Sequence, residues 1–161
     1  MNLSYSAKNL DDQPLSYFQY LFSTLNPPRR ESLAGIHQGM FTGPRWLRNI
    51  AGPGLGLFGL GGWWGKEIQS LEQGTNIVKR RAAYIRILPF QVAQIQSLVD
   101  GKQGVTLHYT DGAWFPWTYV YDEIRRINHT SMLGMTITNL PGFRRVALPF
   151  LLYLQEHDDG L

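Results

Sequence analysis

A lysine, an aspartate and an arginine are the residues of this sequence best placed to do chemistry. Lys66 follows a run of glycines and tryptophans, and Asp122 and Arg125 lie together in the segment 122–126, DEIRR. On a strand, alternate residues share a face, so Asp122 can face inward while Glu123 and Arg125 face the other way. A buried Asp122 could act as general acid or base or hold a ligand, with Lys66 or Arg125 stabilising negative charge. Ordinary ion pairing on a solvated face is the alternative.

Two histidines, His37 and His108, lie on predicted strands. Either could point inward as a catalytic base or a haem ligand, although a structural or surface histidine is the commoner case. No two histidines have the HxH or HxxxH spacing of a metal site, and the sequence has no cysteine. We therefore expect no metal and no cofactor.

Glycines and aromatic residues fill the segment 53–66, PGLGLFGLGGWWGK. A phosphate loop does not fit, because Glu67 stands where GxxxxGK[ST] needs serine or threonine. Glycine also allows close backbone packing around bulky side chains, which is the interpretation we favour. A second aromatic run, 114–119, enters a predicted strand, and its dense aromatics fit a pocket wall or a small core under a loop. The expected pocket aromatics are Trp63, Trp64, Phe115, Trp117 and Tyr121.

The sequence resembles a bacterial family named for a GXWXG motif, whose members carry a following domain of unknown function. The motif fits Gly61-Gly62-Trp63-Trp64-Gly65, extended by Lys66. Further similar pieces bring the resemblance to about residues 35–155: Gly39-x-Phe41-x-Gly43, Trp46-Leu47-Arg48, Asp122-Glu123-Ile124-Arg125 and Leu133-Gly134-Met135-Thr136. This family implies no known activity.

The same motif is similar, more remotely, to the G-x-W of lipocalin-like barrels. In those proteins a tryptophan closes one end of the barrel under an arginine from a late strand. The resemblance implies that Trp63 is the plug and that Arg125 or Arg126 covers it through a cation–π contact. Lipocalins carry the motif in their first strand, whereas some sixty residues precede it here.

The composition fits one domain with much apolar surface to bury in its own core or against a ligand, a partner or a membrane surface. Hydrophobic residues make up 43% of the 161 residues and charged ones only 17%, against roughly 25% charged in an average domain. No run reaches the ~20 apolar residues of a membrane span, and the polar start lacks a secretory signal, so we expect a cytoplasmic protein. The arginine pairs are dispersed along the chain, which argues against a nucleic-acid partner.

Short strands at regular spacing predict a mainly β (α+β) fold. We expect an antiparallel lipocalin-like barrel or strongly curved sheet, with an N-terminal helix and room for short additional helices. Residues 1–12 would form a flexible arm, 13–155 a single barrel-like domain and 156–161 a polar tail. The helix is expected over 14–25, capped by Asp12, as a lid or plug across the body. The expected strands are 33–42, 63–71, 76–81, 83–88, 91–98, 105–110, 119–128 and 132–138, with a helical turn over 44–51 and a helix or closing strand over 144–154.

High aromatic content and few polar motifs favour a protein that binds a small, largely apolar molecule in a barrel pocket. The alternative is a cofactor-independent enzyme, an isomerase, cyclase or hydrolase, that acts on such a molecule with Asp122 as acid or base. Two apolar stretches with arginines at their ends, 44–64 and 146–155, leave contact with a membrane surface as a third alternative. The oligomeric state stays open.

Overall fold

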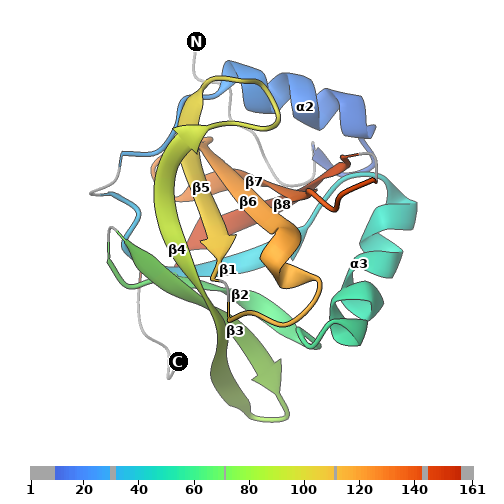
Figure 1. The fold of residues 1–161 in the computed structure, drawn as a ribbon, viewed down its shortest axis with the longest axis vertical. Helices are drawn as coiled ribbons and strands as arrows, with labels where there is room; N and C mark the ends of the chain where they lie inside the picture. The colour runs from blue at the N-terminus through green and yellow to red at the C-terminus, as the bar shows by residue number, and fades with distance from the viewer. Residues whose placement is uncertain (1–9, 30–31, 71, 111, 143–144, 157–161) are drawn as a thin grey trace.

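Eight antiparallel strands close into a barrel in which each strand pairs with its neighbours in the sequence and β1 pairs with β8. The structure is a computed structural model that describes residues 10–29, 32–70, 72–110, 112–142 and 145–156. The strands are β1 (Gly35–Phe41), β2 (Trp63–Ile68), β3 (Gln73–Arg80), β4 (Ala83–Gln96), β5 (Gln103–Tyr109), β6 (Val120–Arg126), β7 (Ser131–Thr138) and β8 (Ala147–Leu154). The predicted mainly β barrel with an N-terminal helix is confirmed (Figure 1).

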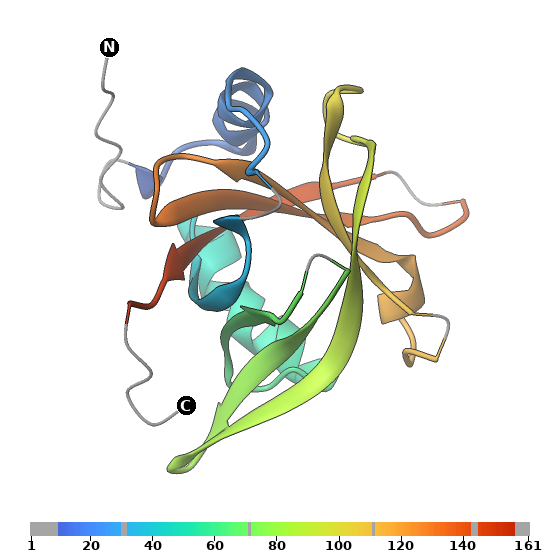
Figure 2. The same cartoon turned by 90° about the vertical axis from the view of Figure 1, so that its left-hand side faces the viewer.

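Helices accompany the barrel at two places. Helix α2 (Leu15–Thr24) lies along one side of it, and helix α3 (Arg45–Leu57) follows β1 (Figures 1 and 2). A short 3-10 helix, η2 (Trp117–Tyr119), leads into β6. No helix in the described ranges is long and apolar enough to cross a membrane.

Helix α2 packs on the outside of the barrel, so its expected role as a lid or plug is wrong. Its buried face, Phe18, Leu21 and Phe22, joins a cluster with Leu133 and Met135. These two residues alternate along β7 with side chains that face the interior. Strand β7 is therefore buried on both faces over most of its length, although Thr136 gives its inner face a polar side chain. The predicted helix itself is confirmed.

The start of the chain is tied to the barrel as far back as Leu10, which is buried. Asp11 bridges to Gly43, and Asp12 pairs with Arg48 on α3 at 2.6 Å. Asp12 is thus not the helix cap that the sequence predicts, because Pro14 takes that position. Residues 10–12 are therefore not part of a flexible arm, and the rest of the arm expected over 1–12 lies outside the described residues. Of the polar tail expected over 156–161, the structure describes Glu156, which is exposed.

Helix α3 is longer than the helical turn that we expect over 44–51. It continues through Pro53 and three glycines to Leu57, where propensity predicts a loop. Residues at helical spacing along α3 form a stripe that faces the barrel: Leu47, Ile50, Ala51, Gly54 and Leu55. Packing of this stripe against the barrel stabilises the helix and offsets the low helix propensity of the glycines and the proline.

Two bulges bend the sheet. Trp64 is an extra residue in β2, because Trp63 pairs with Val78 and Gly65 with Ile77. Leu88 is an extra residue in β4 and has a positive φ of 53°. Strand β4 runs through this bulge and through Pro89, so the two separate strands predicted over 83–88 and 91–98 are one.

The last described segment settles the choice left open over 144–154. Residues 147–154 form the closing strand, β8, which pairs with β7 on one side and with β1 on the other. Pro149 lies within it and pairs with Met135. Phe150 and Leu152 face the barrel interior, whereas Leu151 packs outward in the cluster under α2.

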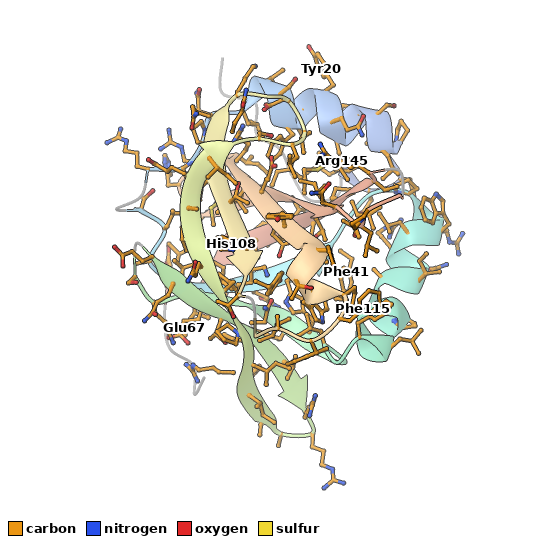
Figure 3. All side chains as sticks on the ribbon, viewed as in Figure 1. Tyr20, Phe41, Glu67, His108, Phe115 and Arg145 are labelled. Carbon is orange, nitrogen blue, oxygen red and sulfur yellow. The ribbon has the colours of Figure 1, made fainter. Side chains whose placement is uncertain are left out.

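Removing a ring from the outer cluster should destabilise the whole domain. Phe18 is fully buried, so we expect Phe18→Ala to lower the free energy of unfolding by about 3–5 kcal/mol in urea titrations. Tyr20 on the same helix is 69% exposed and points away from the body (Figure 3). Tyr20→Ala is the matched control, with an expected change within about 0.5 kcal/mol. Equal losses in the two variants would contradict the packing described for α2.

Candidate functional site

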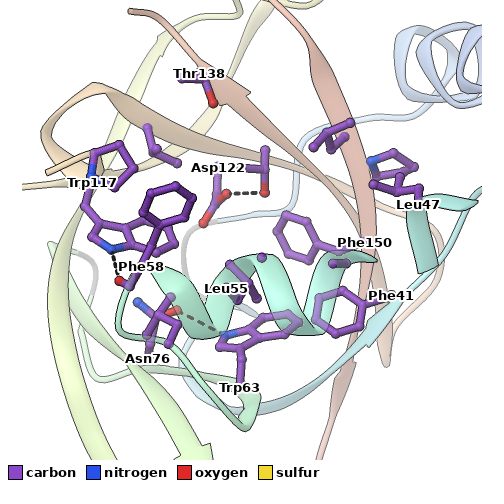
Figure 4. A pocket seen from close by; sticks show the side chains of 18 of the residues that line it. Phe41, Leu47, Leu55, Phe58, Trp63, Asn76, Trp117, Asp122, Thr138 and Phe150 are labelled. Carbon is purple, nitrogen blue, oxygen red and sulfur yellow. Dashed lines mark hydrogen bonds between the residues drawn. The ribbon is translucent and has the colours of Figure 1, made fainter. Parts of the chain in front are cut away.

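A cavity of about 280 Å³ lies between the stripe on α3 and the interior of the barrel (Figure 4). Most of its wall is apolar, formed by aliphatic and aromatic side chains of α3, β1, β2, β8 and the segment around η2. The residues that line it are Phe41, Leu47, Ile50, Ala51, Gly54, Leu55, Phe58, Leu60, Trp63, Lys66, Asn76, Tyr109, Pro116, Trp117, Val120, Asp122, Thr136, Thr138, Leu148, Pro149 and Phe150. This composition is typical of a pocket for an apolar small molecule.

One polar cluster breaks the apolar wall, and five strands contribute to it. We call it the polar cluster: Lys66 (β2), Asn76 (β3), Tyr109 (β5), Asp122 (β6) and Thr136 (β7). Its centre is the ion pair between Lys66 Nζ and Asp122 Oδ2, at 2.8 Å, with both side chains buried. Lys66 also donates to Asn76 Oδ1 at 2.8 Å and to the Tyr109 hydroxyl at 3.1 Å.

The carboxylate of Asp122 receives two further hydrogen bonds. The Tyr109 hydroxyl donates to Oδ2 at 2.9 Å. The Thr136 hydroxyl donates to Oδ1 at 2.6 Å, the bond drawn as a dashed line at Asp122 in Figure 4. Asn76 in turn accepts from Trp63 Nε1 at 3.2 Å and donates to the carbonyl of Leu88 at the bulge, at 3.0 Å. The buried charges are therefore paired and hydrogen-bonded, as stable burial requires.

Aromatic rings enclose the ammonium group of Lys66. Its Nζ lies 5.0 Å from the ring centre of Phe90 and 5.5 Å from that of Tyr109. Trp63 and Phe150 lie at 5.9 and 6.0 Å. These rings stabilise the cation through their electron-rich faces and keep water away from it.

The bulge at Trp64 explains how Trp63 and Lys66 both reach the interior. Residues three apart on a regular strand face opposite sides, and the extra residue restores the common side. Two glycines make this geometry fit. A Cβ on Gly39 would overlap the indole of Trp63, and a Cβ on Gly65 would overlap the carbonyl of His37. Gly65 of the GxWxG pattern, together with Gly39 on β1, thus leaves room for Trp63 and for the backbone that carries Lys66.

Burial sets the protonation of Tyr109. It raises the pKa of the phenol well above its ordinary value, and the charge of Asp122 raises that pKa further. The hydrogen bond from Asn76 acts in the opposite direction. Tyr109 therefore stays a neutral hydroxyl that can donate to the carboxylate.

Four of the residues predicted from the sequence line the cavity: Trp63, Trp117, Lys66 and Asp122. Three others lie on the outer side of the barrel. Trp64 packs edge-on against Tyr84 with ring centres 5.1 Å apart, and Tyr121 and His108 each alternate with an inward residue and pair with one another. Phe115, 64% exposed, is outside the cavity wall in the segment before η2 (Figure 3). Strand alternation accounts for the outward placement of Tyr121 and His108.

His37 is buried but lies outside the cavity wall. It shares the inner face with Lys66, its partner across β1 and β2. Its Nε2 donates to the carbonyl of Leu33 at 2.9 Å, and burial lowers the pKa of the ring, an effect that this hydrogen bond opposes. The neutral ring is thus used structurally, and among the described residues no three histidine, aspartate or glutamate side chains gather into a metal site.

Arg125 is not part of the cavity, and the expected cation–π cover of Trp63 by Arg125 or Arg126 is wrong. The cation over Trp63 is Lys66. Arg125 faces outward, opposite to Asp122, and its guanidinium lies 4.6 Å from the ring centre of Phe22 on α2, with Asp100 at 3.3 Å. Asp122 and Arg125 are three residues apart on β6, so they face opposite sides of the sheet and cannot share the predicted pocket.

Sequence reasoning missed Asn76, Tyr109 and Thr136. Tyr109 could have been predicted, since this residue ends an alternating strand and shares a face with Val105 and Leu107. Thr136 lies in the predicted strand 132–138 and in one piece of the family resemblance, but neither marks its side chain as part of a site. Asn76 carries no local signal, because its role depends on the pairing of β3 with β2 and on the bulge at Leu88.

Removing Tyr109's hydroxyl should change how stability depends on pH. The native state keeps the phenol proton above about pH 10, where an unfolded tyrosine releases it. The contribution of Tyr109 to stability is therefore fully present below about pH 10 and should be lost as pH rises further. Urea titrations of Tyr109→Phe should show a smaller fall than the wild type, with the remainder due in part to Tyr153, whose pKa burial also raises. An identical fall in both proteins would contradict the burial of this group.

The Lys66–Asp122 pair should behave as one unit in a double-mutant cycle. Lys66→Met leaves an unpaired buried carboxylate and Asp122→Asn an unpaired buried ammonium, so we expect each to cost about 3–5 kcal/mol of unfolding free energy. The double variant should cost about 1–3 kcal/mol less than the sum, as measured by urea titration. Strictly additive losses would show that the two charges do not interact.

No protein-family model matches the sequence, and no curated protein matches it. The fold, in contrast, occurs in a solved structure. A protein from Thermomonospora curvata, known from a crystal structure, superimposes with a TM-score of 0.70 over 92% of this chain and 93% of its own, at 16% sequence identity. This likeness shows the barrel fold alone. The resemblance to the GXWXG family stays a prediction.

Proposed function

We propose that this protein binds a small, largely apolar molecule in the cavity between α3 and the barrel. One observation carries the proposal: an apolar cavity of about 280 Å³ whose only ionised lining side chains, among the described residues, are the paired Lys66 and Asp122. A wall of aliphatic and aromatic groups favours apolar ligands, and the polar cluster gives one end of such a ligand a partner.

The position of α3 supports a binding role. Its stripe forms one side of the cavity, while Ile50 is 56% exposed and the adjoining Phe58 is 42% exposed. The cavity wall therefore reaches the molecular surface beside the helix, where a ligand can enter without opening the strands of the barrel.

A cofactor-independent enzyme that acts on an apolar molecule is the second candidate. It is supported by the contacts among Asp122, Lys66 and Tyr109, since a carboxylate that lines a cavity can accept a proton from a substrate. It is less well supported than binding, because Lys66 already has three protein acceptors within hydrogen-bond distance. No N–H of Lys66 is left to stabilise charge that develops on a substrate.

Filling the cavity should abolish binding without unfolding the protein. Gly54 belongs to the stripe on α3, and a Cβ there would meet open space, so Gly54→Phe can place a ring in the cavity. We expect the affinity for a neutral apolar fluorescent probe, a naphthalene without a charged group, to fall at least about tenfold. Thermal stability should hold or rise, because glycine is a poor helix residue.

The matched control adds the same ring to the opposite side of the helix. Asn49 is exposed on α3 and does not line the cavity. Asn49→Phe should bind the neutral probe like the wild type. Unchanged binding by Gly54→Phe, or a wild type that does not bind the probe, would contradict the proposed site.

A further inference from the structure

We infer that the ligand is a neutral apolar molecule whose polar end donates a hydrogen bond, such as an aliphatic or terpenoid alcohol, and that apolar carboxylates are rejected. The inference rests on the proposed function and concerns the same cavity. It follows from the charge balance and the hydrogen-bonding capacity of the polar cluster.

The cluster is already electrically neutral. Lys66 and Asp122 lie 2.8 Å apart, and no other ionisable side chain apart from the neutral Tyr109 lines the cavity within the described part of the chain. A carboxylate ligand would bring a second negative charge next to Asp122, with a single cation to share. An unpaired charge in an apolar site is costly, so the cavity favours a neutral ligand.

The donors of the cluster are all engaged. The three N–H groups of Lys66 match three acceptors: Asn76 Oδ1, the Tyr109 hydroxyl and Asp122 Oδ2. The hydroxyls of Tyr109 and Thr136 both donate to Asp122. The amide of Asn76 donates to the Leu88 carbonyl and, at 3.5 Å, to Tyr109. A ligand that can only accept hydrogen bonds finds no free donor in the cluster.

Acceptors in the cluster still have unused capacity. Asp122 Oδ1 receives one hydrogen bond, from Thr136, and a carboxylate oxygen can accept two. The Thr136 oxygen itself keeps a free lone pair. Thr138, which also lines the cavity, is a neutral hydroxyl that can donate or accept, so it does not reverse this preference. A ligand hydroxyl that donates to Asp122 Oδ1 completes the cluster without a change in charge.

Three probes of equal chain length separate the possibilities. 1-Decanol can donate a hydrogen bond, whereas its isomer nonyl methyl ether can only accept one. Decanoate is an anion at about pH 8. In isothermal titration calorimetry with the full chain, decanol should bind with the highest affinity of the three. We expect the ether to bind about tenfold more weakly, because a hydrogen bond to a charged acceptor is lost, and decanoate more weakly still.

Each ranking has a distinct meaning. If decanol and the ether bind equally, or decanoate binds most tightly, the inference is overturned while the proposed apolar site stands. If none of the three binds, both the inference and the proposed function fail. The wild-type ranking alone decides the matter, so it does not depend on whether a variant folds.

A charge variant tests the reason for the preference. Asp122→Asn leaves the cation of Lys66 without its counter-charge, so the order should reverse and decanoate should bind at least about tenfold more tightly than decanol. Glu67→Gln is the matched control, since it also removes a carboxylate from the barrel wall but one that pairs with Arg86 outside the cavity. It should keep the wild-type order. A folded Asp122→Asn that still rejects decanoate would overturn the charge-balance argument.

Discussion

The ion pair between Lys66 and Asp122 spans the inside of the barrel and joins strands that are not neighbours in the sheet. Two charges withdrawn from water are stable only if their remaining hydrogen-bonding groups find partners, and these partners come from β3, β5 and β7. Five of the eight strands therefore depend on one another through a few polar atoms. The apolar wall could tolerate many substitutions of similar volume, whereas this arrangement admits few.

Strand β6 carries a second buried polar network on its other face. Asp122 faces the cavity, while its neighbour Glu123 accepts hydrogen bonds from the Ser97 hydroxyl and from the backbone N–H of Leu98 outside the barrel. Arg125 follows on the same outer face, between Asp100 and the ring of Phe22. Adjacent acidic residues thus have unrelated tasks: one belongs to the cavity, the other to the seam where the β4–β5 connection packs against the barrel.

Local patterns predicted the features that depend on local chemistry. Alternation identified β5 and β6, apolar spacing identified α2, and the unusual density of glycine and tryptophan marked the segment that supplies Trp63 and Lys66. The failures share a physical cause, namely contacts between distant segments. Helix α3 runs through Pro53 because it packs over the cavity, and β4 runs through Pro89 because Leu88 bulges. The site residue Asn76 and the outward position of Arg125 likewise follow from strand pairing and alternation.

The pairing of β1 with β8 also has a consequence for how the chain acquires its structure during synthesis. Strand β1 leaves the ribosome before the other strands of the barrel and pairs with β2 on one side, but its other edge stays unpaired until β8 has been made. Until residues 147–154 emerge, β1 and β7 both present unpaired backbone groups, and open edges of this kind are where nascent chains associate with one another. Closure is a long-range step that favours slow folding. Loss of the final strand would thus leave an aggregation-prone open sheet in place of a smaller barrel.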